Sequence, residues 1–384
     1  MPAVDRLAVR PLPQLDELRA WVAPGPGPRV TVHLPIQRAV PDLRQNAPLL
    51  ERAAREVEAR LLALGVDPAR AGARAAALLA IDLELARLPA GTRALVALQD
   101  SRALHAIALP DSTPYRVDVG ESFVLRPLLQ ALQRHAPFRV LTVSLNRVAL
   151  WESGPDGLRE TPLAGVPASL PEALGQELTA KQIRVRGTGR GGTQPVFYSH
   201  GSARDERKLD LQRFHEALAR TLGPALADRA SPIVLAATED HQGGLRALVK
   251  LPSLLGEALV GNFDHATAAE LAERCAPVVE RWRARRADQA GEDWERARNR
   301  GKAIDLLDDV GAAALAGRVW RLWIDAERSL AGRLDPDTGC TLRGDGYGDA
   351  LDALCELVLA RGGEVIPVDA ARLPSANGVA AELR

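Results

Sequence analysis

The sequence predicts a mixed α/β (α+β) protein of three domains. Its 384 residues are more than one ordinary hydrophobic core encloses. An apolar fraction of 46% with 26% charged residues is typical of a folded globular protein. Helix and strand patterns alternate along the chain and change in character near residues 137 and 266. We therefore predict an N-terminal α+β domain at 1–136, a central domain at 137–265 and a C-terminal α/β/α domain at 266–384.

The composition excludes several classes of protein. No charged segment followed by an apolar one marks a secretion signal, and no apolar run is long enough to span a bilayer, so we expect a cytoplasmic protein without membrane contact. The cysteines Cys275, Cys340 and Cys355 are widely separated and predict neither disulfides nor zinc ligands. We expect them to be small buried side chains. The net charge is zero, so any polyanion partner must be bound by a local patch.

The first domain is predicted to open with a short strand at Arg29–Ile36, after a proline and glycine segment that forbids regular structure. A helix at 45–64 follows, with apolar residues on one stripe. Asp67 and Pro68 then predict the start of a second helix that runs to Leu88. Strands near 92–98 and 103–109 complete the domain. The polar residues around Arg44 and Asn46 admit two interpretations, helix capping or a contact site, and we favour capping.

The second domain is predicted to begin with a three-stranded meander at 138–145, 148–152 and 158–163. Ser169 and Glu172 have the spacing of a capping box at the start of a short helix. Past the glycine-rich stretch, a helix is predicted with one apolar face and one free basic face. Its apolar face consists of Leu211, Phe214, Leu218 and Leu222. A buried strand at 232–238, a brief helix near 244–250, a strand ending at Val260 and a turn at 261–264 close this domain.

The third domain is predicted to open with a helix whose capping box is Thr267 with Glu270. Mixed charges at helical spacing along its continuation indicate a solvated face. A helix at 304–316, a strand at 318–325, a turn segment through 335–339, a helix at 347–361 and a strand at 364–368 follow. Alternation of helices and strands with short connections predicts an α/β/α sandwich.

The most informative stretch is the glycine-rich loop predicted at 187–202, which has four glycines between Gly187 and Gly192. Glycine adopts positive φ without strain and lets a backbone approach a large partner closely, so the stretch is either an ordinary surface loop or a binding loop. The flanking sequence favours the second interpretation. Residues 181–220 hold nine Lys and Arg against four Asp and Glu, which indicates a polyanion as partner.

Other chemistry fits the sequence less well. Gly187, Gly189 and Gly192 match a dinucleotide-binding fingerprint, but Pro195 follows where that motif needs the start of a helix, so a nucleotide-binding enzyme is only an alternative. A metal hydrolase would need clustered ligands. His200, His215, His241 and His265 are instead scattered singly and are interpreted as surface or loop residues. We expect no metal and no cofactor. No nucleophile elbow of a serine hydrolase is present.

Five local sequences, in order, resemble the bacterial relatives of the archaeal and eukaryotic peptide-chain release factors and Pelota-type proteins. They are His33–Ile36 with Arg38 and Arg44–Asn46, Val143–Leu150, His200 with Gly201, Val260–Asp264, and Ala316–Val319. The resemblance covers the whole chain. It implies an N-terminal domain, a central domain that carries the catalytic loop, and a C-terminal domain similar to ribosomal proteins that bind kinked RNA.

The same resemblance implies the site residues. Release factors of this kind place a Gly-Gly-Gln tip in the peptidyl-transferase centre, where the glutamine positions water against the ester of peptidyl-tRNA. Here Gly191 and Gly192 are followed by Thr193 and only then by Gln194, and Pro195 restricts Gln194 to an extended backbone. A displacement of about 1 Å can cost roughly 100-fold in rate, so hydrolysis is put in doubt while binding is not.

The sequence therefore predicts a release-factor-like, ribosome-associated protein that acts in termination, rescue or dormancy. Its implied partners are ribosomal RNA, tRNA and a translational GTPase. The predicted catalytic residues are Gly191, Gly192 and Gln194. The predicted RNA-binding residues are Arg184, Arg186, Arg190, His200, Arg204, Arg207 and Lys208. A non-catalytic protein-interaction module on the same fold stays open as an alternative, because a fold does not fix a function.

Overall fold

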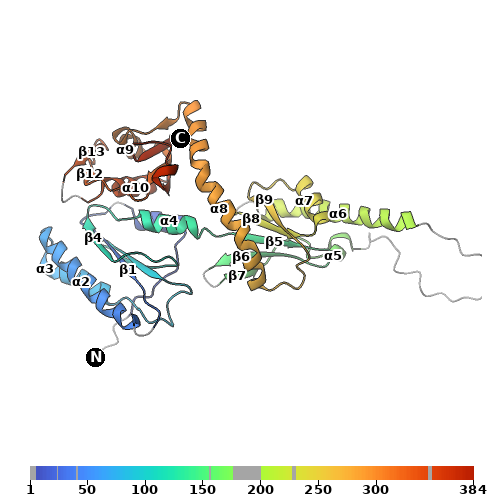
Figure 1. Ribbon diagram of the computed structural model, residues 1–384, viewed down its shortest axis with the longest axis horizontal. Helices are drawn as coiled ribbons and strands as arrows, with labels where there is room; N and C mark the ends of the chain where they lie inside the picture. Colours follow the sequence, from blue (N-terminus) through green and yellow to red (C-terminus); the bar gives the residue numbers. More distant parts are fainter. Residues whose placement is uncertain are drawn as a thin grey trace, which may run out of the picture. The chain divides into compact units, whose positions relative to one another are not determined.

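The computed structural model describes residues 6–23, 25–39, 42–154, 157–175, 200–226, 231–344 and 348–384, with backbone only at 200–206 and 287. The chain forms two compact units. Unit 1 consists of Met1–His135 together with Arg283–Arg384, and unit 2 of Ala136–Trp282 (Figure 1). The first boundary lies one residue from the predicted one at 136. Unit 1 contains the predicted first domain and most of the predicted third, and the division into three domains stays a prediction.

Unit 2 is built on a five-stranded mixed sheet in the order β7-β6-β5-β8-β9. Its strands are β5 (Arg139–Val143), β6 (Val148–Gly154), β7 (Gly157–Thr161), β8 (Ile233–Ala237) and β9 (Leu254–Val260). The predicted meander is confirmed, because β5, β6 and β7 pair antiparallel in sequence order. Strands β8 and β9 add to it in parallel, so the sheet joins two kinds of pairing. The three parallel strands therefore end at the same edge of the sheet.

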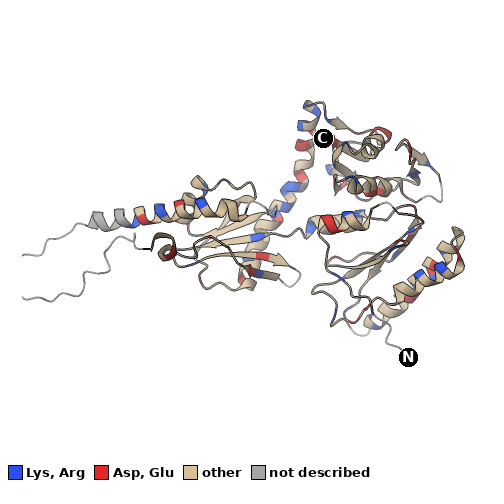
Figure 2. Ribbon diagram, turned by 180° about the vertical axis from the view of Figure 1, so that it is seen from behind, with Lys and Arg blue, Asp and Glu red and all other residues tan. Residues whose placement is uncertain are grey.

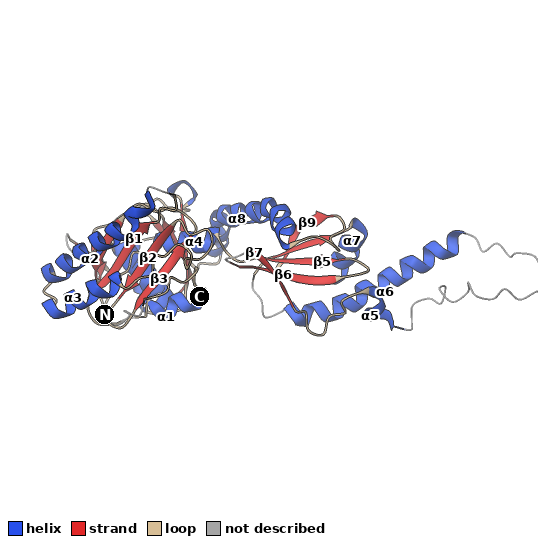
Figure 3. Cartoon of the chain, turned by 90° about the horizontal axis from the view of Figure 1, so that it is seen from below, coloured by secondary structure: helices blue, strands red, loops and turns tan. Residues whose placement is uncertain are grey.

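Helices cover both faces of this sheet (Figure 3). On one face lie α5 (Leu170–Leu174), α6 (His200–Leu226) and α7 (Glu239–Leu248). Phe214, Leu218 and Leu222 of α6 are fully buried there, which confirms three of the four residues of the predicted apolar face; the fourth, Leu211, is partly buried. The first part of α8 (Ala268–Asn299) covers the other face through Leu271, Cys275 and neighbouring residues.

Unit 1 contains a four-stranded antiparallel sheet from its N-terminal part, in the order β3-β2-β1-β4. The strands are β1 (Arg29–Pro35), β2 (Ala94–Gln99), β3 (Leu104–Leu109) and β4 (Arg116–Gly120). One face packs against α2 (Asn46–Ala63), which the short helix η1 (Asp42–Gln45) precedes, and against α3 (Pro68–Leu79). The other packs against α1 (Leu15–Trp21) and α4 (Arg126–Arg134). The predicted extension of α3 to Leu88 is wrong, because residues 81 and 82 leave the helix to pair with Leu7.

A second sheet of unit 1 has the order β10-β15-β11-β14. Its strands are β10 (Ala303–Ile304), β11 (Val319–Asp325), β14 (Glu364–Val368) and β15 (Val379–Leu383). Helices α9 (Leu307–Leu315) and α10 (Ala350–Ala360) cover one face. The last part of α8 covers the other, where Trp294 packs edge-on against Trp323. The predicted mixed α/β fold with a C-terminal α/β/α sandwich is thereby confirmed.

Several elements of unit 1 were not predicted from the sequence. They are α1, β4, α4, β10, the short 3-10 helix η3 (Ala370–Arg372), β15, and the hairpin of β12 (Gly332–Leu334) with β13 (Thr341–Arg343). The predicted turn at 335–339 connects the two strands of that hairpin. It is held by Asp335, whose carboxylate accepts hydrogen bonds from the backbone N–H of Asp337 and Thr338. Strand β15 matters most, because it lies between β10 and β11 in the sheet.

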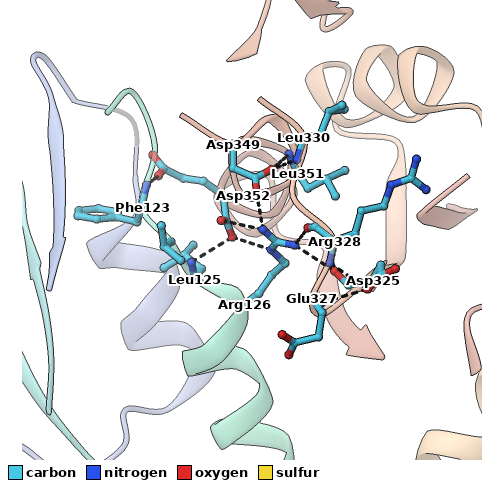
Figure 4. A network of polar contacts seen from close by, with 12 residues as sticks. Phe123, Leu125, Arg126, Asp325, Glu327, Arg328, Leu330, Asp349, Leu351 and Asp352 are labelled. Atoms are coloured by element: carbon cyan, nitrogen blue, oxygen red, sulfur yellow. Dashed lines mark hydrogen bonds and ion pairs between the residues drawn. The ribbon is translucent and has the colours of Figure 1, made fainter. Parts of the chain in front are cut away.

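A buried ionic network joins the two sequence segments of unit 1 (Figure 4). Arg126, at the start of α4, donates through Nε to Asp352 at 3.0 Å and through Nη2 to Asp349 at 2.5 Å. Asp349 is the N-cap of α10, and all three side chains are less than 7% exposed. The neighbouring carboxylates raise the pKa of Arg126 despite its burial, so the guanidinium stays charged. Because these side chains are desolvated, removing either Arg126 or its carboxylate partners would leave a buried, unpaired charge.

A second arginine extends this network. Arg29 on β1 pairs with Asp100 at 2.8 Å and with Glu356 of α10 at 3.1 Å. Burial by itself raises the pKa of Asp100, but hydrogen bonds from the backbone of Arg102 and Ala103 outweigh it and lower the pKa to about 2. Asp349, Asp352 and Glu356 thus form an acidic stripe on one side of α10. We call these three residues the α10 acidic stripe.

Candidate functional site

Most of the predicted site lies outside the described residues. Arg184, Arg186, Arg190, Gly191, Gly192 and Gln194 belong to that part. His200 and Arg204 lie on α6, where the backbone alone is described. Arg207 and Lys208 are exposed on the same helix. The structure therefore places the basic segment after the glycine-rich stretch on the N-terminal part of α6, and it leaves the predicted catalytic residues untested.

The short helix α5 precedes the glycine-rich stretch, and the long helix α6 follows it. Helix α5 begins as predicted, because the Ser169 hydroxyl accepts a hydrogen bond from the backbone N–H of Glu172 at 3.4 Å. The Glu172 carboxylate in turn accepts one from the backbone N–H of Ala168 at 2.9 Å. The helix ends at Gly175, whose φ of 53° favours glycine. Both α5 and α6 pack on the same face of the sheet, α6 through the part of the helix that begins at Phe214.

A buried histidine pair fixes α6 against α7. Nε2 of His215 lies 2.9 Å from Nδ1 of His241, so one ring donates and the other accepts. Both side chains are about 5% exposed or less. Burial lowers the pKa of His215 to about 4, and the neighbouring His241 adds to this effect. Burial likewise lowers the pKa of His241. The prediction that these histidines are isolated surface residues is wrong, because the packing of two helices brings together residues 26 positions apart.

This pair makes unit 2 sensitive to acid. An unfolded histidine takes up its proton near pH 6.5, whereas folded His215 resists protonation down to about pH 4. As the pH is lowered, the unfolded state binds the proton first. The free energy of unfolding should therefore fall by roughly 3 kcal/mol between pH 6.5 and about pH 4. We expect urea midpoints of unit 2 to drop over this range. The variant His215→Asn should lose part of that dependence. Equal pH dependence in both proteins would contradict the assignment.

Two turns that carry part of the family resemblance meet at the carboxyl end of the parallel strands. The β5–β6 turn contributes Ser144 and Asn146, and the turn after β9 contributes Asn262 and Asp264. Asn146 Nδ2 donates to Asp264 Oδ2 at 3.0 Å, and Asn262 Oδ1 accepts from the Asp264 backbone N–H at 2.9 Å. Burial by itself raises the pKa of Asp264, but side-chain hydrogen bonds with Ser144, Asn146 and Asn262 outweigh it and lower the pKa.

The contact between these turns was not foreseen, although both were singled out. The mixed α/β fold class could have predicted it, because parallel strands bring their carboxyl ends to one edge of a sheet, and ligands of such sheets bind there. Here the polar side chains satisfy one another, so the cluster fixes the two turns. The polar residues around Arg44 and Asn46, for which helix capping was the favoured interpretation, have a similar role, because the N-cap residue Gln45 makes no side-chain capping bond. Asn46 holds Gln37 by two backbone hydrogen bonds of 2.9 Å, which ties the end of β1 to α2.

Within the described ranges, no group of three or more His, Cys, Asp or Glu residues is arranged to hold a metal ion. Cys275 and Cys355 are buried as predicted, and Cys340 is partly exposed. The helices described here also include none with the length and apolar character needed to cross a bilayer.

Residues 137–318 match the model of bacterial archaeo-eukaryotic release factor family 3. The family resemblance seen in the sequence is thereby confirmed for a little under half of the chain. The matched range includes the glycine-rich stretch, α6 and both turns. No curated protein matches this chain.

Several solved structures are similar along nearly the whole chain. An archaeal Pelota in a ribosome-bound model with ABCE1 has 14% identity, with 100% of this chain and 97% of that chain covered and a TM-score of 0.40. The archaeal termination factor aRF1 has 16% identity, 96% coverage of each chain and a TM-score of 0.22. Dom34 of S. cerevisiae has 7% identity, with 97% of this chain and 91% of that chain covered and a TM-score of 0.34.

Proposed function

We propose that this protein associates with the ribosome as a release-factor-like translation factor that acts in termination, rescue or dormancy. The observation that carries the proposal is the family match over 137–318, which includes the glycine-rich stretch and the basic segment. The exposed Arg207 and Lys208 on α6 support it, because they leave cations free for phosphates beside that stretch. The proposed site of action is the cytoplasm, and a translational GTPase is the proposed protein partner.

In this proposal the glycine-rich stretch contacts ribosomal RNA. Arg184, Arg186 and Arg190 bind phosphates, together with His200, Arg204, Arg207 and Lys208. Gly191 and Gly192 allow close approach of the backbone. Gln194 is the residue that would position water. It stands one residue later than the glutamine of a Gly-Gly-Gln tip, so in this proposal binding is kept whether or not hydrolysis occurs.

The test is co-sedimentation of the purified chain with bacterial ribosomes through sucrose gradients at two salt concentrations. We expect association that weakens as salt rises, since phosphate contacts release counterions. The triple change Arg184→Glu, Arg186→Glu and Arg190→Glu should abolish it. A matched control changes three exposed cations of the same unit that lie outside residues 181–220, Arg159, Lys250 and Arg274, to glutamate. Equal loss in both triple variants would mean that net charge, and not this stretch, governs binding.

A single change separates binding from chemistry. Gln194→Ala should leave co-sedimentation unchanged, and release of a model peptidyl ester by the two proteins then reports on the glutamine. Equal release by the unchanged chain and by Gln194→Ala would remove Gln194 from any catalytic role. If the folded chain does not associate with ribosomes at either salt, the translation proposal fails and the protein-interaction module becomes the leading hypothesis.

A further inference from the structure

Four exposed cations gather at one end of the second sheet of unit 1. The backbone N–H of Leu383 donates to the carbonyl of Lys302 at 2.8 Å, and that of Arg384 donates to the carbonyl of Arg318 at 2.9 Å. The Arg384 side chain donates through Nη2 to the carbonyl of Arg361 at 3.1 Å. These bonds hold the four residues together although they come from four segments of the chain. We call Lys302, Arg318, Arg361 and Arg384 the C-terminal basic cluster; Figure 2 shows Lys and Arg, in blue, beside the chain end marked C.

The charge of this cluster is not compensated locally. Among the described residues, none of its four members forms an ion pair with an acidic side chain. The nearest acid in sequence, Glu382, is bound by Arg300 at 2.8 Å and lies 3.9 Å from Arg321. Glu364 is bound by Arg321 at 3.0 Å. These two acids are therefore already paired with other arginines, and the positive charge of the cluster remains for an anionic partner.

A large aromatic side chain lies next to the cluster. The pairing of β11 with β15 shifts between Val319 and Arg321, so Trp320 is the extra residue of a β-bulge. Its side chain is 49% exposed, whereas Trp323 three residues later is 1% exposed. Arg318 lies two residues before Trp320 in the chain, and Leu383, the partner of Val319, comes just before Arg384. The bulge thus presents an exposed indole ring at the end of the sheet where the C-terminal basic cluster lies.

We propose that Trp320 and the C-terminal basic cluster form a binding surface for unpaired RNA. An exposed aromatic ring stacks on a base of any sequence, and flanking cations bind the phosphates on either side. An acidic peptide would use the cations but would gain little from the indole face. The surface lies in unit 1, apart from the glycine-rich stretch in the sequence, so it goes beyond the function proposed above and does not depend on it.

The test measures binding of a short fluorescein-labelled oligouridine to the full chain by fluorescence anisotropy. It is carried out in the Arg184, Arg186 and Arg190 to glutamate background, so that the glycine-rich stretch does not contribute. Trp320→Ala should weaken binding roughly 10-fold, and Trp320→Phe should restore most of the affinity because a ring remains to stack. Matching melting temperatures for the two variants show that the fold is intact.

The cations are tested through the salt dependence. Changing Lys302, Arg318 and Arg361 to glutamine should reduce the slope of log affinity against log salt by about 2, since each phosphate contact with a single strand contributes roughly 0.7. The matched control changes three exposed arginines of the same unit, Arg55, Arg70 and Arg343, to glutamine and should leave the slope unchanged.

Two results would overturn this proposal: an affinity that Trp320→Ala leaves unchanged, or equal competition by polyglutamate and unlabelled oligouridine. A failure of the chain to sediment with ribosomes can be distinguished from both of these binding results. A chain that does not sediment with ribosomes but binds oligouridine through Trp320 would sink the translation proposal and support this one.

Discussion

Arg126→Met is expected to destabilise unit 1 by roughly 3 to 5 kcal/mol, because it leaves two buried carboxylates without their cation. Asp349 and Asp352 both depend on this side chain, and the guanidinium also donates to the backbone carbonyls of Asp325 and Arg328. One substitution therefore removes a partner from two segments that approach α4. Arg126→Lys should recover only part of the loss, since an ammonium group cannot reproduce the planar fork.

The matched control is on the same helix. Arg134 pairs with Asp111 at 3.1 Å, but its side chain is 57% exposed, so Arg134→Met should cost less than about 1 kcal/mol. Urea unfolding compares the variants, and hydrogen exchange in peptides from α4 and α10 locates the effect within unit 1. Equal midpoints for Arg126→Met and Arg134→Met would show that the buried network contributes no more than a surface pair.

Gly244→Ala is the second large effect expected, and it comes with a control one residue away. A Cβ at Gly244 would lie 2.0 Å from Nδ1 of His215, whereas a Cβ at Gly243 meets nothing within 4 Å. Gly244→Ala must push the His215 ring aside and break its bond to His241, at a cost of roughly 1 to 3 kcal/mol. Gly243→Ala should instead stabilise α7 by up to about 1 kcal/mol, because alanine favours helix over glycine.

Thermal unfolding of the two variants settles this comparison, since they add the same methyl group to the same helix. Opposite shifts of the melting temperature are expected. Two stabilised variants would mean that the space beside His215 is larger than the structure shows, and two destabilised variants would point to a strain in α7 that is unrelated to the histidine pair.

The sequence was sufficient for elements with strong local patterns. The apolar stripe of α6 placed Phe214, Leu218 and Leu222 correctly, and the meander predicted at 138–145 and 148–152 corresponds to the pairing of β5 with β6. It failed for β15, whose five residues carry little alternation. That strand exists because two flanking strands supply its hydrogen bonds, which is tertiary context that no local pattern contains.

The polar clusters were harder to predict than the elements that carry them. His215 and His241 looked unrelated because nothing local links them, and Arg126 is 223 residues from Asp349. Such partners become visible only when the packing of elements is known. The two turns that meet at Asn146 and Asp264 were noticed separately, each for its resemblance to a family, and the parallel strands explain why they meet.

The discontinuous course of unit 1 has a consequence for its synthesis. The N-terminal segment leaves the ribosome long before α10 exists, so Arg126 must wait for carboxylates more than 220 residues downstream. Arg29 has Asp100 in its own segment but must wait for Glu356. Unit 2 is continuous and can fold in that interval, because domains generally fold as units during synthesis. Contacts of such long sequence separation form slowly, so the first sheet stays exposed to misassembly until the last strand, β15, has been made. A chain interrupted before α10 would therefore contain a complete unit 2 beside an N-terminal segment that lacks its acidic partner.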